Sequence, residues 1–289
     1  MILVTGATGT IGRPLLDLLV RTGVAVRAVS RDPQANARPA NALPAGVEVV
    51  AGDPSRPDTI ARYLEGVSAV FLHPRAVGDA AGELLALARQ RNVARVVALS
   101  AINVDDDPAE QPSRLQGDRN KEAEDAAVAS GLAWVSLRPA SFAVNTLRAW
   151  APQLRTGDVV RGPYAGFAEP LIHEADVAEV AARALVDPGL DGRKLRLTGP
   201  QSLSQKDLVS IIGDVLGRPL RYQEIPAEAF RPAMVGRGLP PAFVDALLAR
   251  YARGVGPAET VTDEVDKVLG RPARTYAAWV HDHAAAFQR

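Results

Sequence analysis

The chain has 289 residues, 47% of them hydrophobic and 23% charged, which is the balance of a soluble globular protein with an ample core. Its 33 basic and 33 acidic side chains cancel, which argues against a general nucleic-acid binder or an anionic-membrane binder. There is no cysteine, which excludes disulfides and thiolate sites, and the spacing of His281 and His283 does not favour a metal site.

The first half alternates short β-branched runs with longer amphipathic stretches, a pattern that predicts βαβ units around a parallel sheet. The predicted strands are Ile2–Thr5, Ala25–Ser30, Val47–Val50, Ala69–Leu72, Val96–Ser100, Trp134–Arg138 and a seventh near Lys194–Thr198. The predicted helices are Thr10–Thr22, Pro57–Glu65, Asp79–Arg91 and Ser113–Ser130. The Ala, Asn and Pro content of Asp32–Gly46 indicates a loop, and Ile102–Pro112 indicates a second one.

The regular alternation breaks after Pro139. Glycines, prolines and aromatics in Asp158–Pro170 predict a turn-rich or short-stranded insert. The helices predicted after it are Asp176–Val186, Gln205–Leu216, Pro240–Arg253 and Thr275–Phe287. We therefore expect a Rossmann-type doubly wound sheet in residues 1–150 and about 173–200, and a small, mainly helical substrate domain in about 151–172 and 201–289.

The strongest motif is the run Gly6, Ala7, Thr8, Gly9, Thr10, Ile11 and Gly12, which follows an apolar strand and opens a helix. Glycine lets the backbone turn tightly and approach a pyrophosphate, and the helix N-terminus offers unpaired N–H groups to the phosphates. The motif alone is weak evidence, but its strand–turn–helix context predicts dinucleotide binding.

The end of the second strand indicates which dinucleotide is bound. An acidic residue there usually binds the ribose 2′-hydroxyl, whereas an arginine accommodates a 2′-phosphate. Arg31 ends this strand, and Arg13 follows the glycine motif, so the pair can clamp a phosphate. NADP(H) is therefore favoured over NAD(H). NAD(H) stays an alternative, because Asp32 is an acidic residue at the same strand end.

Three further strand ends carry polar residues that we expect to face the cofactor, because ligands bind at the carboxyl ends of parallel strands. Asp53 follows the third strand and is a candidate acceptor from the adenine amino group, or a turn-forming residue. His73 ends the fourth strand. Ser100 ends the fifth, where it is a candidate catalytic and cofactor-binding residue or a helix-capping one.

The sequence resembles the NmrA-like group of atypical short-chain dehydrogenases/reductases almost throughout. The runs VTGATGTIG, SGLAW…LRPASF and LTGPQSLS…LGRP carry the resemblance, and the last two are the specific ones. The resemblance implies a Rossmann domain with a C-terminal substrate domain. It also implies one of two activities, either an NADPH-dependent quinone, enone or ether reductase or a regulator that binds dinucleotide without turning it over.

The wider superfamily pairs a strand-end serine with Tyr-x-x-x-Lys, and here Lys121 matches the lysine. Gly117 stands at the tyrosine position, so the usual proton donor is absent. The resemblance implies that Lys121 acts alone or through water, with a pKa lowered by desolvation. The alternative is a solvated lysine that pairs with Glu124 or Asp125 at helical spacing.

The resemblance also places Pro139 and Phe142 beside the nicotinamide. Phe142, Asn145, Trp150, Tyr164 and His173 are candidate substrate contacts, although buried aromatic residues are more often plain core. Asp176 is predicted to be the N-cap of the following helix.

These features favour an NADPH-dependent reductase of a small, apolar carbonyl, enone or quinone. The missing tyrosine keeps open a non-catalytic redox sensor that acts through a protein partner, and less strongly a redox-neutral isomerase or cyclase. We expect a small-molecule substrate, no nucleic acid, no membrane and no metal. The chain opens without a basic leader or a long apolar run, so we also expect a cytoplasmic monomer or homodimer.

Overall fold

The computed structural model describes residues 1–35, 42–256 and 259–288. The chain folds into two compact units, each made of separate segments. The first unit comprises Met1–Asp105, Gly117–Pro139 and Glu174–Arg196. The second comprises Asp106–Gln116, Ala140–His173 and Leu197–Arg289. The division drawn from the sequence assigned residues 106–116, 140–150, 173 and about 197–200 to the first domain instead.

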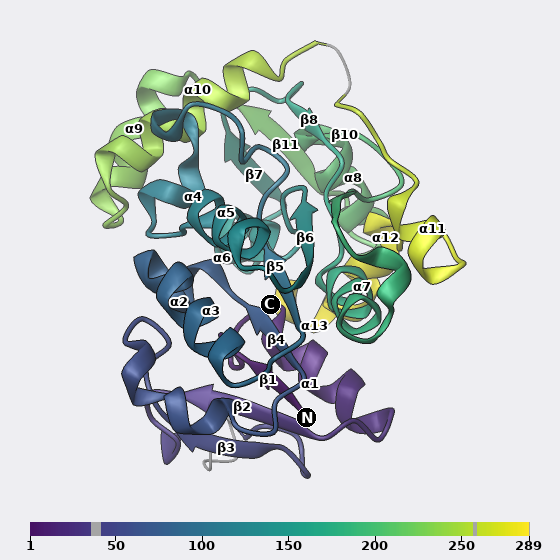
Figure 1. The fold of residues 1–289 in the computed structure, drawn as a ribbon. Coiled ribbons are helices and arrows are strands. Elements are labelled where there is room, and N and C mark those ends of the chain that lie inside the picture. Colours follow the sequence, from purple (N-terminus) through teal and green to yellow (C-terminus); the bar gives the residue numbers. More distant parts are fainter. Residues whose placement is uncertain (36–41, 257–258, 289) are drawn as a thin grey trace. The chain divides into compact units, whose positions relative to one another are not determined.

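A seven-stranded sheet forms the centre of the first unit (Figure 1). Its order is β3-β2-β1-β4-β5-β6-β9, and the five neighbouring pairs from β3 to β6 are parallel. This order confirms the predicted doubly wound α/β fold of the Rossmann type. The strands are β1 Ile2–Val4, β2 Val26–Ser30, β3 Glu48–Ala51, β4 Ala69–Leu72, β5 Arg95–Leu99, β6 Ala133–Pro139 and β9 Arg193–Leu197.

Helices cover both faces of this sheet (Figure 1). Leu3 and Val70 belong to an apolar cluster with side chains from α3 and α5. Their neighbours Val4 and Phe71 are equally buried and point to the opposite face, because side chains alternate along a strand, and there α1 packs beside α7. The helices of this unit are α1 Gly12–Arg21, α2 Pro74–Val77, α3 Ala81–Gln90, α5 Asn120–Ala129 and α7 Glu174–Val186.

The second unit has its own core, in which the fully buried Trp279 packs with side chains from α6, α8 and α13. Two short sheets join distant segments, with β11 parallel to β7 and β10 antiparallel to β8, as the predicted short-stranded insert requires. The elements are α4 Pro112–Leu115, α6 Asn145–Leu154, β7 Val159–Gly162, β8 Ala168–Glu169, β10 Leu203–Ser204, α8 Gln205–Leu216, β11 Arg221–Glu224, α9 Ala227–Gly236, α10 Pro241–Arg253, α11 Glu264–Leu269, α12 Tyr276–Asp282 and α13 Ala284–Phe287.

Several helices differ from the sequence-based prediction. The helix expected at Ser113–Ser130 is interrupted, with α4 ending at Leu115 and α5 beginning at Asn120. Helix α7 begins at Glu174, so Asp176 lies inside its first turn and is not the N-cap. The stretch Pro57–Glu65 forms two short 3-10 helices rather than one α-helix. Residues 36–41 of the predicted loop Asp32–Gly46 lie outside the described residues.

Helices α6 and α9 were not predicted at all. Each contains a proline, Pro152 in α6 and Pro232 in α9, and an internal proline is normally a signal against a helix. Across the described residues, every helix is too short or too polar to cross a lipid bilayer.

Candidate active site

The order of the sheet reverses between β1 and β4, and this reversal marks the place where a ligand is expected in such folds. Thr5, the residue after β1, ties the two strand ends together. Its backbone N–H and its side-chain hydroxyl both donate to the carbonyl oxygen of Phe71, at 3.1 and 2.9 Å. Its Oγ1 in turn accepts the backbone N–H of His73 at 2.8 Å. These hydrogen bonds hold the backbone at the start of the glycine turn and the backbone of His73 next to each other.

The glycine turn has no room for side chains at two positions. Gly6 has a φ of +65°, and a Cβ there would lie 2.6 Å from Cγ of His73. A Cβ on Gly12 would lie 2.2 Å from the carbonyl oxygen of Gly6, so the first turn of α1 packs directly on the backbone of the glycine turn. Ile11 is buried beneath the turn, Thr8 is exposed and Thr10 is half-buried. The missing side chains at Gly6 and Gly12 leave backbone beside the imidazole of His73, and they allow the close approach that a pyrophosphate requires.

Two buried polar atoms at the neighbouring strand ends have no hydrogen-bond partner among the described residues, Nδ1 of His73 and Oγ of Ser100. A buried polar atom without a partner is costly, so each needs a ligand group or water. Burial lowers the pKa of His73, against the opposing charge of Asp118, and the imidazole is therefore neutral at pH 7. These atoms and the glycine turn fit a dinucleotide.

Arg31 lies one residue beyond β2, and its side chain is exposed. Asp32 accepts the backbone N–H of Ala35 at 3.0 Å, a turn-forming contact that occupies one of its carboxylate oxygens. Arg13 lies in the first turn of α1 and donates to the carbonyl oxygen of Ala42 at 2.7 Å. Asp32 and Arg13 are thus engaged in hydrogen bonds, whereas the exposed guanidinium of Arg31 forms none with the described residues.

Asp53 forms a turn after β3. Its Oδ1 accepts the backbone N–H and the hydroxyl of Ser55, at 3.1 and 2.8 Å. Burial opposes ionisation, but these hydrogen bonds and the nearby Arg56 hold the pKa of Asp53 below its ordinary value. One carboxylate oxygen is therefore committed to the turn, the alternative role considered for this residue.

Lys121 lies in the first turn of α5, 43% exposed, and its Nζ contacts Oδ1 of Asp125 at 2.5 Å. This hydrogen bond raises the pKa of Lys121. The lowered pKa expected from desolvation is therefore wrong, because the ammonium is solvated and paired. Gly117 precedes the helix and has a φ of +98°, so residues 117 and 121 do not share a helix face.

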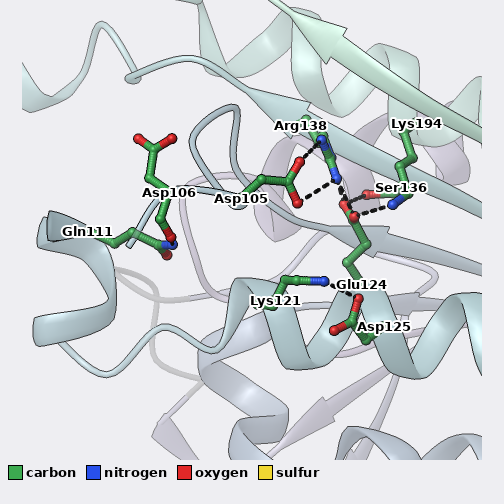
Figure 2. A network of polar contacts seen from close by, with 9 residues as sticks. All are labelled: Asp105, Asp106, Gln111, Lys121, Glu124, Asp125, Ser136, Arg138 and Lys194. Carbon is green, nitrogen blue, oxygen red and sulfur yellow. Dashed lines mark hydrogen bonds and ion pairs between the residues drawn. The ribbon is translucent and has the colours of Figure 1, made fainter. Parts of the chain in front are cut away.

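A buried charge network that the sequence did not predict joins α5 to β6 and β9 (Figure 2). Glu124 is fully buried and accepts from Arg138 at 2.5 and 2.9 Å, from Ser136 at 2.5 Å and from Lys194 at 2.9 Å. Arg138 also pairs with Asp105 at 2.8 Å. Burial alone would raise the pKa of Glu124, but the hydrogen bonds from Arg138, Ser136 and Lys194 lower it to about 2.

This network fixes the strand end that leads into the second unit, because Arg138 directly precedes Pro139, the buried last residue of β6. Arg138 lies within the run LRPASF, one of those that carry the family resemblance, and Glu124 precedes it by 14 residues. The signal in the sequence was a Glu and an Arg placed on a predicted helix and the strand after it, but spacing alone does not show that they meet.

The candidate substrate residues lie in different environments of the second unit. Phe142 is half-buried and bridges to Ile172, and Asn145 is exposed at the start of α6. Tyr164 has a left-handed backbone with a φ of +52° in a tight turn. Trp150 is 7% exposed and meets Tyr222 edge to face at 6.4 Å, which is the environment of a core residue. The buried His173 lies 3.4 Å from a carboxylate oxygen of Asp282.

Residues 6–188 match the family described as NAD(P)H-binding. The chain is 35% identical to a (4-alkanoyl-5-oxo-2,5-dihydrofuran-3-yl)methyl phosphate reductase of Streptomyces griseus and 35% identical to an NAD(P)H azoreductase of Xenophilus azovorans, with 99% of both chains covered in each case. Its fold is similar to that of an Escherichia coli NADPH-dependent quinone oxidoreductase solved with NADPH, with a TM-score of 0.79 over 99% of this chain and 100% of that one, at 24% identity. The chain therefore belongs to the NAD(P)H-binding family, and within it is an NAD(P)H-dependent reductase.

Proposed function

We propose that this reductase uses NADPH to reduce a small, apolar quinone, enone or related carbonyl compound, as a member of the NmrA-like group. The observation that carries the proposal is the glycine turn beside two buried polar atoms without partners, on His73 and Ser100. The relatives at 35% identity, named as a reductase of a butenolide phosphate and as an azoreductase, support an electron-poor conjugated acceptor.

Bound NADPH supplies a hydride to such an acceptor. The N-terminus of α1 binds the pyrophosphate with its N–H groups and its dipole, while Gly6 and Gly12 let the backbone approach. Ser100 and the neutral His73 supply hydrogen-bonding groups at the ends of β5 and β4. Arg31 offers an exposed guanidinium for the 2′-phosphate, which favours NADPH over NADH.

Lys121 is the next candidate near the nicotinamide ribose. Because its pKa is raised, it is a poor proton donor at neutral pH, but it is a fixed positive charge that can hold the ribose hydroxyls. Lys121→Met should therefore raise the NADPH dissociation constant and leave turnover at saturation nearly unchanged. A fall in turnover of about 100-fold at saturation, the range of general acid catalysis, would assign the proton transfer to Lys121 instead.

Substrate side chains are proposed in the second unit, with Phe142, Asn145 and Tyr164 as contacts and His173 as a further candidate. The test is steady NADPH oxidation followed at 340 nm with quinones, enones, azo dyes and plain ketones. We expect quinones and enones to be reduced and plain ketones to be spared. If NADPH binds but is oxidised by none of these acceptors, the reductase proposal fails, and the hypothesis of a non-catalytic dinucleotide sensor is then better supported.

We further propose a cytoplasmic enzyme that works as a monomer or homodimer on a small-molecule substrate. Light scattering of the purified protein, with and without NADPH, measures its mass in solution. A larger assembly would contradict this part of the proposal.

A further inference from the structure

A serine and an arginine meet in the second unit, just beyond the end of β6. Ser141 is the second residue after Pro139, and Nη1 of Arg250, on α10, donates to its Oγ at 3.0 Å. The backbone of Ser141 is fixed as well, because its carbonyl oxygen accepts the N–H of Ile172 at 2.9 Å. Ser141 therefore follows the carboxyl end of β6 within two residues, and ligands bind at the carboxyl ends of parallel strands.

Arg250 is held in one orientation by its surroundings. Its Nη2 contacts Oε2 of Glu169 at 2.7 Å, and Glu259 lies 3.9 Å away. The guanidinium also lies over the ring of Phe167, 5.8 Å from its centre, and that ring packs on Tyr251 at 4.6 Å. Two carboxylates therefore compensate the charge of Arg250, which makes it unsuited to binding an anionic substrate, and one N–H of its Nη1 points at a neutral hydroxyl.

The direction of this hydrogen bond matters for the chemistry. Arginine is always protonated and only donates, so Oγ of Ser141 must accept. The hydroxyl hydrogen of Ser141 is then directed to another acceptor, and among the described residues the structure gives it none. Because Ser141 is half-buried rather than sealed in the core, a substrate atom can fill that role.

We propose that Ser141, polarised by Arg250, donates the hydrogen bond that stabilises the substrate oxygen as it becomes negative during reduction. This inference rests on the proposed quinone or enone reductase function. For an enone, a hydride from NADPH adds to the β-carbon, the C=C electron pair moves to the carbonyl oxygen, and NADP⁺ is formed. Ser141 donates to that enolate oxygen and keeps its proton, and solvent water then protonates the α-carbon. The sum is enone, NADPH and one proton giving saturated ketone and NADP⁺.

This role replaces what the tyrosine does in the wider superfamily, since Gly117 offers no hydroxyl. A preorganised donor aimed at the developing charge is one of the largest contributions to such a reaction. Ser141 is the catalytic residue in this proposal, and Arg250 is a positioning residue that acts through it.

The experiment compares Ser141→Ala, Ser141→Thr and Arg250→Lys with the parent enzyme. The control is Arg231→Met, which breaks an exposed ion pair from α9 to Asp245 on α10 without touching Ser141. We measure NADPH affinity by fluorescence and kcat for a series of quinones that differ in reduction potential. Ser141→Ala should lower kcat by about 100-fold, the loss typical for one such donor, with NADPH affinity unchanged.

Ser141→Thr should recover much of that rate, Arg250→Lys should give an intermediate loss, and the control should match the parent. The loss should also grow as the quinones become weaker acceptors, because these depend most on the hydrogen bond; a purely structural defect lowers every rate by the same factor. If Ser141→Ala turns over like the parent, or the loss is uniform across the series, the inference is overturned while the reductase function stands. If the parent reduces no acceptor, the proposed function fails and the inference falls with it.

Discussion

Gly12 has no room for a side chain. A Cβ there would approach the carbonyl oxygen of Gly6 to 2.2 Å, and that oxygen belongs to backbone that cannot move without opening the turn. Gly12→Ala should therefore weaken NADPH binding at least tenfold and also lower the melting temperature. The matched control is Gly82→Ala on α3, where nothing lies within 4 Å of the added methyl and alanine is the better helix former. Calorimetry with NADPH checks both, and equal affinities in the two variants would contradict the packing argument.

Arg31 decides between the two cofactors in the proposed site. If its guanidinium binds the 2′-phosphate, Arg31→Ala should weaken NADPH binding by about 1.5–3 kcal/mol, the range of a charged hydrogen bond. NADH binding should hardly change, because NADH lacks that phosphate. The exposed Arg21 at the end of α1 is a control of the same charge, and Arg21→Ala should affect neither cofactor. Equal losses for NADPH and NADH would show that Arg31 has a structural role.

At the scale of elements, the anchor between α5 and the sheet is a buried ion network rather than apolar packing alone. The pKa of Glu124 falls from 4.5 to about 2, so its folded form binds protons more weakly than the unfolded chain. The stabilisation is therefore complete above pH 4.5 and is lost as the pH falls from there towards 2. We expect Glu124→Gln to lower the free energy of unfolding by about 3 kcal/mol at pH 7, the equivalent of that shift.

Urea unfolding at several pH values measures this, and the difference between parent and variant should shrink below pH 4.5. The neighbouring Asp125→Asn is the control, because Asp125 is 56% exposed and its pair with Lys121 should contribute no more than about 0.5 kcal/mol. A larger effect for Asp125 than for Glu124 would contradict the assignment of the anchor.

The elements also show where sequence-based prediction succeeds. The seven strands and helix α1 follow from local sequence patterns, because inner strands such as β1 and β4 are short apolar runs, β9 alternates polar and buried apolar residues, and α1 carries an apolar stripe. The glycine turn follows from a local motif. Helices α6 and α9 were missed because Pro152 and Pro232 normally end a helix. Helix α6 nevertheless buries Trp150 and Leu154, and α9 lies against α10. The pairs Glu124–Arg138 and Ser141–Arg250 were missed because their members are 14 and 109 residues apart, and periodicity does not report such contacts.

At the scale of the whole molecule, NADPH binding should raise the free energy of unfolding. The two compact units have separate apolar cores, and the glycine turn, His73 and Ser100 all belong to the first. NADPH at 100 times its dissociation constant should stabilise the folded state by about 2.7 kcal/mol. Hydrogen exchange measured with and without NADPH should show this protection in the segments of the first unit around β1 and β4. Protection confined to the second unit would contradict the assignment of the dinucleotide site.

Gly117 also limits how the proposed catalytic site can evolve. Its φ of +98° suits glycine, whereas a tyrosine placed there would be strained even though nothing within 4 Å obstructs its Cβ. Helix α5 begins only at Asn120, so that phenol would also lie off the helix and not one turn above Lys121. No single substitution therefore restores the Tyr-x-x-x-Lys geometry. A return requires the connection at 116–119 to become helical first, a step that brings no catalytic gain of its own, and selection on activity therefore favours variation at other donors in the chain.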